Sequence, residues 1–140
     1  MITAIDTNVL IALWDEDDAL NIPARNALDA AYDAGRLVVS GMVFAELLSG
    51  PRRTEEVIEG FLAEAAIAID WEIDEPIWRN AAKAYQGYSK RRKRQNQKEP
   101  RRLLTDFLIG AHAYERKYAL LTLDARIFKI AFPRLKVISA

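Results

Sequence analysis

The stretch ITAIDTNVLIALW, residues 2–14, is apolar at both ends and polar in the middle. Residues 2–5 form a short apolar run of the kind found in buried strands, and this run ends abruptly at the polar residues 6–8. Residues 9–14 are apolar again and follow a polar residue that is suited to begin a helix. The stretch therefore predicts a strand, a polar corner and a helix.

The rest of the chain repeats this alternation. Further apolar runs that predict strands lie at 37–40, 67–69, 119–123 and 135–138. Apolar residues at helical spacing predict helices at 20–34, 42–49, 57–66, from Asp74 into the tract 90–102, at 105–117 and at 125–131. Alternating strands and helices predict an α/β fold in three layers, with a central parallel sheet flanked by helices. Because no repeat or long linker divides the sequence, we expect one domain over residues 1–140.

Composition excludes several kinds of site. The 140 residues include no cysteine and one histidine, which excludes disulfides, thiolate metal sites, cysteine nucleophiles and multi-histidine zinc sites. No apolar stretch is long enough to span a membrane, and the N-terminus lacks the features of a secretory signal. We therefore expect a soluble, cytoplasmic protein with no membrane partner.

The net charge of zero hides an asymmetry along the chain. Residues 1–75 contain 16 Asp and Glu against 4 Lys and Arg, and residues 76–140 contain 4 against 16. Eight of these basic residues lie in the tract 90–102. Such a tract can contact the phosphates of a nucleic acid, or it can be a mobile, solvated loop, and the two interpretations are compatible.

Four acids differ from the rest because each interrupts or directly follows an apolar stretch: Asp6, Glu46, Asp106 and Asp124. Asp6 and Asp124 each follow a predicted strand. Ligands of an open parallel sheet bind beyond the carboxyl ends of its strands, so all four acids could converge on one crevice. Carboxylates gathered in this way repel one another unless a divalent cation is present, and an all-oxygen cluster suits Mg²⁺ or Mn²⁺. We expect these four residues to hold the metal and carry out catalysis, because such ions hydrolyse phosphodiesters.

Each acid also has a simpler structural interpretation. Asp6 and Asp124 could be helix N-caps, and Asp106 could be an acid that stabilises the first turn of its helix. Glu46 could lie on a wet face of its helix or pair with an arginine. The joint placement of the four acids, rather than any one of them, favours a metal site.

The acids lie within four segments that resemble the successive motifs of PIN-domain nucleases, most closely the VapC-type toxins of prokaryotic toxin–antitoxin pairs: residues 5–10 (IDTNVL), 42–47 (MVFAEL), 105–113 (TDFLIGAHA) and 121–128 (LTLDARIF). The motifs occur in order and span nearly the whole chain. The resemblance implies a flavodoxin-like sheet with an acidic pocket, Mg²⁺-dependent cleavage of RNA, a homodimer, and inhibition by a cognate antitoxin. It assigns the family's acidic positions to the four acids, and it assigns Asn8 and Thr122 to neighbouring positions that orient them. The acidic N-terminal half could receive a basic segment of the antitoxin.

Three other functions compete with this one, and the residues present argue against two of them. One is a housekeeping PIN nuclease that processes RNA or structured DNA without an antitoxin. Another is a non-enzymatic receiver or binding module that uses Asp6, but a receiver needs paired acids after the first strand and the sequence lacks them. The third is a phosphatase of the haloacid-dehalogenase type, which would need Asp at position 8, where Asn8 stands.

Other conspicuous side chains favour structural roles. His112 follows Asp106 by six residues and would point about 240° away around the helix. The tryptophans, Trp14, Trp71 and Trp78, predict packing in the core or in a dimer interface rather than stacking on bases. The acidic cluster at residues 15–18 predicts a solvated loop.

Overall fold

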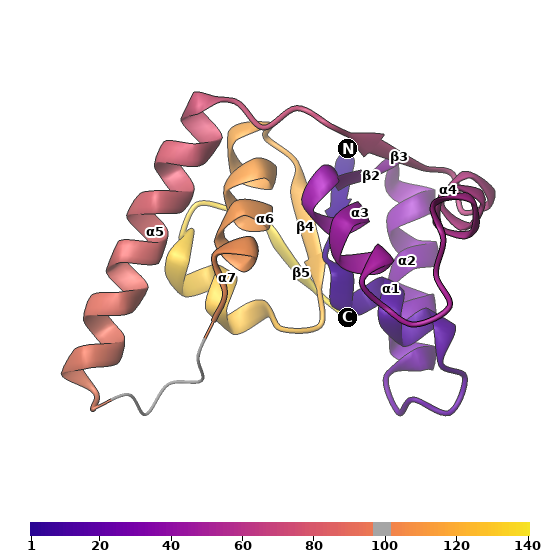
Figure 1. Ribbon diagram of the computed structural model, residues 1–140, viewed down its shortest axis with the longest axis horizontal. Helices are drawn as coiled ribbons and strands as arrows, with labels where there is room; N and C mark the ends of the chain where they lie inside the picture. The colour runs from indigo at the N-terminus through magenta and orange to yellow at the C-terminus, as the bar shows by residue number, and fades with distance from the viewer. Residues whose placement is uncertain (97–101) are drawn as a thin grey trace.

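The computed structural model describes residues 1–96 and 102–140 of the chain (Figure 1). Five strands alternate with the helices: β1 (Ile2–Ile5), β2 (Arg36–Ser40), β3 (Ile67–Asp70), β4 (Ala119–Thr122) and β5 (Val137–Ser139). In the described residues the helices are α1 (Thr7–Trp14), α2 (Asn21–Ala34), α3 (Gly41–Leu48), α4 (Glu55–Glu64), α5 (Glu75–Arg94), α6 (Leu104–Glu115) and α7 (Ala125–Ala131). The strands and helices predicted from the sequence are present, with ends displaced by a few residues.

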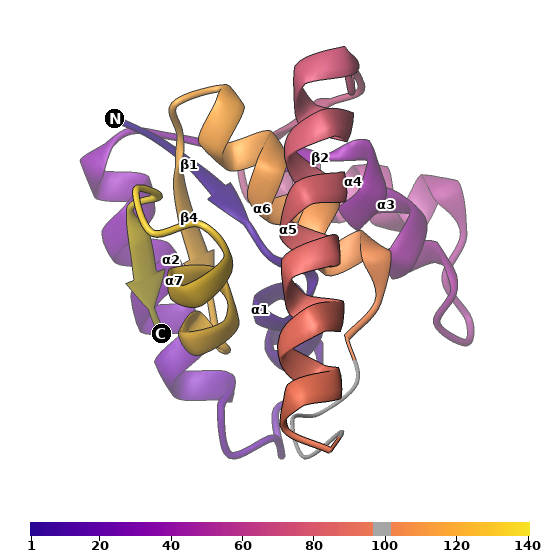
Figure 2. The same ribbon diagram turned by 90° about the vertical axis from the view of Figure 1, so that its left-hand side faces the viewer.

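The five strands form one sheet in the order β3-β2-β1-β4-β5, and every neighbouring pair is parallel. Figure 2 shows α3, α5 and α6 on one side of β1 and β4, with α2 on the other side. This arrangement confirms the predicted α/β fold with a central parallel sheet between two layers of helices. The sheet order also places β1 in the centre, so the corner after β1 lies between the corners that follow β2 and β4.

The core explains why the central segments are so apolar. In α6, every residue from Phe107 to Ala113 is buried, because this helix packs against both α5 and β4. Phe107 lies 5.3 Å from the rings of Tyr85 and Tyr88, which α5 contributes. Asp106, the acid in the first turn of α6, therefore lies at the start of a largely buried helix.

The strands end in a row of polar residues along the carboxyl end of the sheet. Ser40 pairs in register with Asp70, and Thr122 pairs with Ser139. Asp6 extends β1 by one residue, because its backbone N–H donates to the carbonyl of Leu121 over 2.9 Å. The carboxyl end of the sheet is thus lined with groups that can accept or donate hydrogen bonds.

The structure corrects two expectations about individual segments. Trp71 and Trp78 are 59% and 49% exposed, so packing in the core is wrong for both, and the alternative of a dimer interface stays a prediction. Trp14 does pack inward, 4.7 Å from the ring of Phe61. The basic tract is not simply a loop, because residues 90–94 continue α5, whereas residues 97–101 lie outside the described part.

The acidic cluster of residues 15–18 is a solvated turn, as predicted. Residues 15–18 form the turn between α1 and α2, where they are mostly exposed and bond with one another's backbone. No helix within the described residues is long and apolar enough to cross a membrane.

Candidate active site

Asp6 follows the central strand at the carboxyl end of the sheet, and its side chain is only 5% exposed. It occupies the N-cap position of α1, but its side chain makes no capping hydrogen bond. Oδ2 of Asp6 instead accepts a hydrogen bond of 2.8 Å from the hydroxyl of Thr122 on the neighbouring strand. The N-cap interpretation of this carboxylate is therefore wrong, and its orientation is set by β4.

Thr122 connects three segments of the site. Besides donating to Asp6, its Oγ1 accepts hydrogen bonds from the backbone N–H of Asp124 at 3.0 Å and from Nδ2 of Asn8 at 3.4 Å. Asn8 also accepts from the backbone N–H of Leu123 through its Oδ1, at 3.2 Å. Thr122 orients Asp6 directly, as expected, whereas Asn8 acts through Thr122 and the end of β4.

Glu46 approaches the same corner from α3, where it is half-buried. Its Oε1 accepts a hydrogen bond of 2.6 Å from the hydroxyl of Thr7, the first residue of α1. This bond joins Glu46 to a buried threonine rather than to an arginine or to open solvent. The sequence analysis did not single out Thr7; its only signal was its place directly after Asp6.

Asp106 and Asp124 complete the group on the other side of β1. Asp106 is half-buried, and its Oδ2 accepts from the backbone N–H of Leu103 at 3.3 Å, so it does have the structural role in the first turn that the simpler interpretation gave it. Asp124 stands at the N-cap position of α7 without a side-chain capping bond, so its N-cap interpretation is wrong. Its Oδ2 forms an ion pair with Nη1 of Arg102.

The electrostatics show that the four acids act on one another. The pKa of Asp6 is raised to about 6, chiefly by burial and also by the charges of Asp106 and Glu46, while the hydrogen bonds from Thr122 and from the backbone of Thr7 act in the opposite direction. Burial likewise raises the pKa of Glu46, to which the charge of Asp106 adds. The pKa of Asp106 is raised by burial and by the charge of Asp124, while the Leu103 N–H and Arg102 act in the opposite direction. The structure thus concentrates negative charge at the carboxyl end of the sheet.

This arrangement has the donor chemistry of a hard divalent cation. Every side-chain donor that the four acids supply is oxygen, and a cation among them would relieve the repulsion that contributes to the raised pKa values of Asp6, Glu46 and Asp106. However, no three His, Cys, Asp or Glu residues of ranges 1–96 and 102–140 already lie close enough together to hold an ion. The donor set therefore fits Mg²⁺ or Mn²⁺, but binding would have to draw the carboxylates together.

His112 lies away from these acids and has a structural role, as expected. It is buried, and its Nε2 lies 2.7 Å from Oδ2 of Asp70 at the end of β3. Arg116 extends this network, because it contacts Asp70 at 3.5 Å and bonds to Asp74 at 3.0 Å. Asp74 caps α5 by accepting from Ile77 N, so these contacts tie β3, α5 and α6 together.

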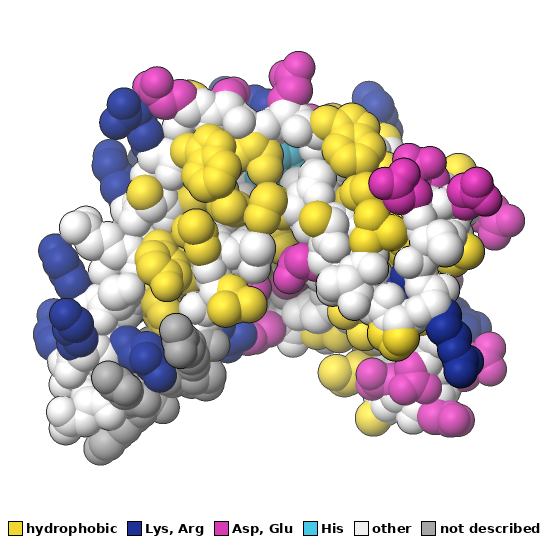
Figure 3. Space-filling model, viewed as in Figure 1, with side chains coloured by type: hydrophobic (Ala, Val, Ile, Leu, Met, Phe, Trp, Pro, Cys, Tyr) yellow, Lys and Arg dark blue, Asp and Glu magenta, His cyan; other side chains and the backbone are white. Residues whose placement is uncertain are grey.

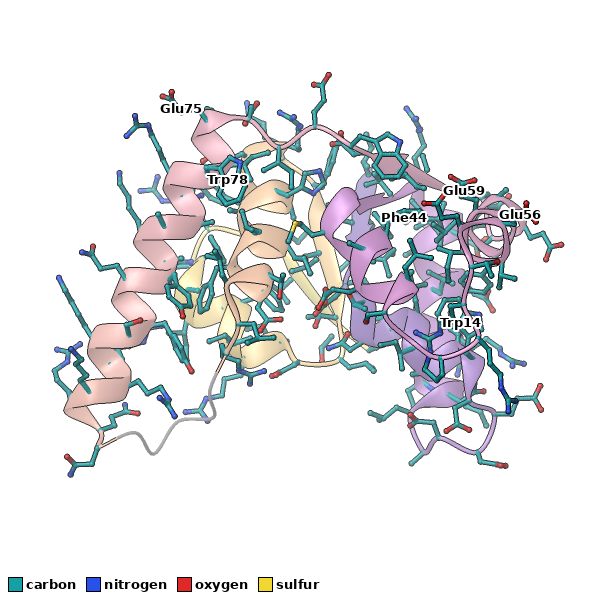
Figure 4. The ribbon with its side chains drawn as sticks, viewed as in Figure 1. Trp14, Phe44, Glu56, Glu59, Glu75 and Trp78 are labelled. Carbon is teal, nitrogen blue, oxygen red and sulfur yellow. The ribbon has the colours of Figure 1, made fainter. Side chains whose placement is uncertain are left out.

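Charge is distributed unevenly over the surface, in line with the asymmetry of the sequence. Figure 3 shows Lys and Arg gathered over α5 and Asp and Glu gathered at the opposite end, over α4. The labelled Glu56 and Glu59 point outward from α4 (Figure 4). The last turn of α5 carries Arg91, Arg92, Lys93 and Arg94, and it leads towards the segment that begins α6 and bears Asp106.

Comparisons with known proteins find one matching family model and several similar solved structures. The family model described as PIN domain matches residues 3–133. No curated protein sequence matches significantly. Among solved structures, VapBC-1 from nontypeable Haemophilus influenzae is similar, with a TM-score of 0.69, 21% identity, and coverage of 99% of this chain and 98% of that one.

Two further structures share the fold at similar distance. VapBC2 from Rickettsia felis, bound to a DNA fragment from its promoter, has a TM-score of 0.64 at 19% identity and covers 99% of this chain and 98% of its own. FitAcB from Neisseria gonorrhoeae has a TM-score of 0.61 at 19% identity, with coverage of 99% and 97%. At these identities the likeness establishes the fold.

Proposed function

Since the chain belongs to the PIN domain family, we propose that it is a Mg²⁺-dependent endoribonuclease that acts as the toxin of a toxin–antitoxin pair. PIN domains are nucleases, so the chain is a hydrolase that acts on nucleic acid. We infer that residues 1–140 form one such domain, which the single five-stranded sheet supports. RNA in the cytoplasm is the proposed substrate.

The observation that carries the proposal is the buried, mutually repelling carboxylate group around Asp6. A buried carboxylate whose pKa is raised to about 6 is unfavourable at neutral pH unless a cation compensates it. We propose that Asp6, Glu46, Asp106 and Asp124 hold one or more Mg²⁺ ions, or Mn²⁺ in their place. When bound, the ion supplies positive charge that acidifies a water molecule and stabilises the oxygens of the phosphodiester.

Neighbouring side chains would prepare the acids for this role. Thr122 keeps an oxygen of Asp6 turned towards β4, and Thr7 keeps an oxygen of Glu46 turned towards α1. An ionised carboxylate has several lone pairs, and those that do not accept a hydrogen bond from the threonine stay available to a cation. The two hydroxyls therefore orient the acids without neutralising them.

The basic end of α5 supports an RNA substrate. Lys93 and Arg94 are exposed in its last turn, and Arg102 reaches Asp124 itself. Cations beside an acidic centre can neutralise the phosphates of a strand that would otherwise be repelled. We propose that this surface binds the RNA backbone and that its affinity depends on salt concentration.

Exposed apolar side chains support a homodimer. Large apolar residues remain exposed on α5, at the start of α6 and in the loop after β3: Trp78, Tyr85, Leu103, Leu104 and Trp71. Figure 3 shows hydrophobic side chains gathered over α5 and α6. Figure 4 shows Trp78 on α5, beside α6. Apolar surface of this extent is typical of a protein interface, so we propose that two copies associate through this face.

A cognate antitoxin is proposed because the similar structures bear the names of such systems. VapBC-1 shares the fold over 99% of this chain, and a structure from Klebsiella pneumoniae that shares it over 98% is a toxin–antitoxin complex. The acidic surface of α4 offers a complementary site for a basic antitoxin segment. A PIN nuclease that works without an antitoxin would lack this partner.

Induced expression in a bacterial host tests the proposal. Wild type should arrest growth and create new RNA 5′ ends at a restricted set of sites, whereas Asp6→Asn, which keeps the acceptor for Thr122, should do neither. We expect a small open reading frame next to the gene to encode the antitoxin, and its co-expression should restore growth. New 5′ ends in the Asp6→Asn strain at the wild-type level would contradict the proposed chemistry, and growth arrest that no neighbouring gene relieves would favour a nuclease without an antitoxin.

A further inference from the structure

Contacts of both its backbone and its side chain hold Arg102 beside the four acids. Its backbone N–H donates to the hydroxyl of Tyr88 over 2.6 Å, and Tyr88 is buried in α5 against Phe107 of α6. Its guanidinium pairs through Nη1 with Oδ2 of Asp124. The two side chains are 27% and 38% exposed, so the pair is partly shielded from water. The contact between α5 and α6 therefore positions Arg102 at the fourth carboxylate.

The charge of Arg102 divides the acidic group into two halves. It acts on Asp106 as well as Asp124, since it lowers the pKa of Asp106 against the effect of burial. The charges that act on Asp6 come instead from Glu46 and Asp106, and both raise its pKa. Positive charge is thus already supplied to the Asp106–Asp124 half by the chain itself.

A divalent ion that used all four acids would need an oxygen of Asp124. A guanidinium bonded to Oδ2 withholds one of these oxygens, and two cations near one carboxylate repel each other. We propose that Arg102 is a displaceable counter-ion that competes with the divalent ion for Asp124. The inference rests on the proposed function in that it takes the four acids as the metal site, and it adds that the chain sets its own affinity for the metal.

The competition predicts a specific pattern of metal affinity. Replacing Arg102 by Gln should tighten Mn²⁺ binding about two- to fivefold, the range that corresponds to the loss of a partly exposed ion pair. Arg102→Lys keeps the charge and should bind Mn²⁺ nearly as wild type does. Arg126→Gln is the matched control, because Arg126 lies two residues after Asp124 but its side chain is exposed. It should change the affinity by much less than Arg102→Gln.

The test is calorimetric titration of Mn²⁺ into the purified, EDTA-stripped full chain, with a double-mutant cycle at Asp124. If Arg102 competes at Asp124, then Arg102→Gln has a smaller effect in an Asp124→Asn background, where only its action on Asp106 remains. Circular dichroism of each variant in EDTA verifies that it is folded. Equal Mn²⁺ affinities of wild type and Arg102→Gln, or an equal effect in both backgrounds, would overturn the inference.

The outcomes separate this inference from the proposed function. Tighter Mn²⁺ binding by Arg102→Gln supports the inference even where no RNA is cleaved, because the readout is metal affinity. Mn²⁺ binding without cleavage of any RNA would contradict only the proposed nuclease. If no variant binds Mn²⁺, both the metal site and the role of Arg102 are wrong.

Discussion

The hydroxyl of Thr122 donates a hydrogen bond of 2.8 Å to Oδ2 of Asp6 and joins residues that are 116 positions apart in the chain. It is the shortest of the bonds that Thr122 makes, and its acceptor is a carboxylate that is almost fully buried. A hydrogen bond to a charged group contributes more than one between neutral groups. The bond therefore both fixes the carboxylate and opposes the rise in its pKa.

Thr122→Val tests this relationship. The substitution keeps the shape of the side chain but removes the donor, so it should destabilise the protein by about 2 kcal/mol. In EDTA it should also raise the midpoint at which the Asp6 carboxyl titrates above about 6, as followed by NMR, because the bond that lowers the pKa of Asp6 is removed. Thr105→Val is the control, since Thr105 Oγ1 is buried without a hydrogen-bond partner among the described residues. An unchanged midpoint in Thr122→Val would mean that Thr122 has only a structural role.

The raised pKa of Asp6 predicts how stability depends on pH in the absence of metal. Because the folded protein binds this proton more tightly than the unfolded chain, the charged carboxylate costs stability as pH rises from about 4 through about 6. Asp6→Asn should therefore be more stable than wild type at pH 7.5 in EDTA, by about 3 kcal/mol at most, and should lose this advantage at pH 4. Thermal unfolding at both values measures the difference. Equal stability of the two proteins at pH 7.5 would contradict the raised pKa.

The pair of Asp70 and His112 should matter for stability but not for cleavage. Burial acts to raise the pKa of Asp70, but the bond from His112 and the charge of Arg116 outweigh it, so the pKa is lowered. Its contribution to stability is therefore present at neutral pH and is lost as pH falls below the ordinary range of an aspartate. Asp70→Asn should lower the melting temperature at pH 7 and leave cleavage at 25 °C nearly unchanged. A large loss of cleavage in a folded Asp70→Asn variant would assign this network to the active site.

The basic end of α5 should set the affinity for RNA rather than the chemistry. Lys93→Gln with Arg94→Gln should flatten the salt dependence of binding, with the logarithmic slope falling by about 0.7 for each phosphate that is no longer neutralised. Arg79→Gln with Lys83→Gln removes the same charge from exposed positions nearer the start of α5 and serves as the control. Binding of a labelled RNA to an Asp6→Asn background at several salt concentrations gives the slopes. Equal slopes in the two double variants would leave RNA binding to other cations.

Much of the fold follows from local patterns that the sequence carries by itself. Residues 2–5 and 119–123 could be predicted as strands because both faces of a central parallel strand are buried and its residues are mostly apolar. The helix from Glu75 could be predicted because Asp74 is an N-cap with Pro76 in the following turn. The position of each acid relative to these elements also followed, since Asp6 and Asp124 come directly after strands.

Relationships between distant segments could not be predicted in this way. Arg102 was one of eight basic residues in its tract, and only the packing of Tyr88 against Phe107 brings it to Asp124. The sequence likewise did not distinguish Asp70 from other acids at strand ends, because its contact with His112 depends on where α6 packs. The exposure of Trp71 and Trp78 depends on what covers their faces, which local spacing does not determine. The roles of the four acids in metal binding stay predictions.

Single-turnover cleavage of RNA in Mg²⁺ and in EDTA, by wild type and by the substitutions Asp6→Asn, Glu46→Gln, Asp106→Asn and Asp124→Asn, tests the central claim most directly. We expect wild type to cleave only when Mg²⁺ or Mn²⁺ is present, and each folded variant to lose cleavage by at least about a hundredfold, on the order of 3 kcal/mol of transition-state stabilisation. Undiminished cleavage by wild type in EDTA, or by a variant that lacks one of the four acids, would contradict a metal centre built from these carboxylates.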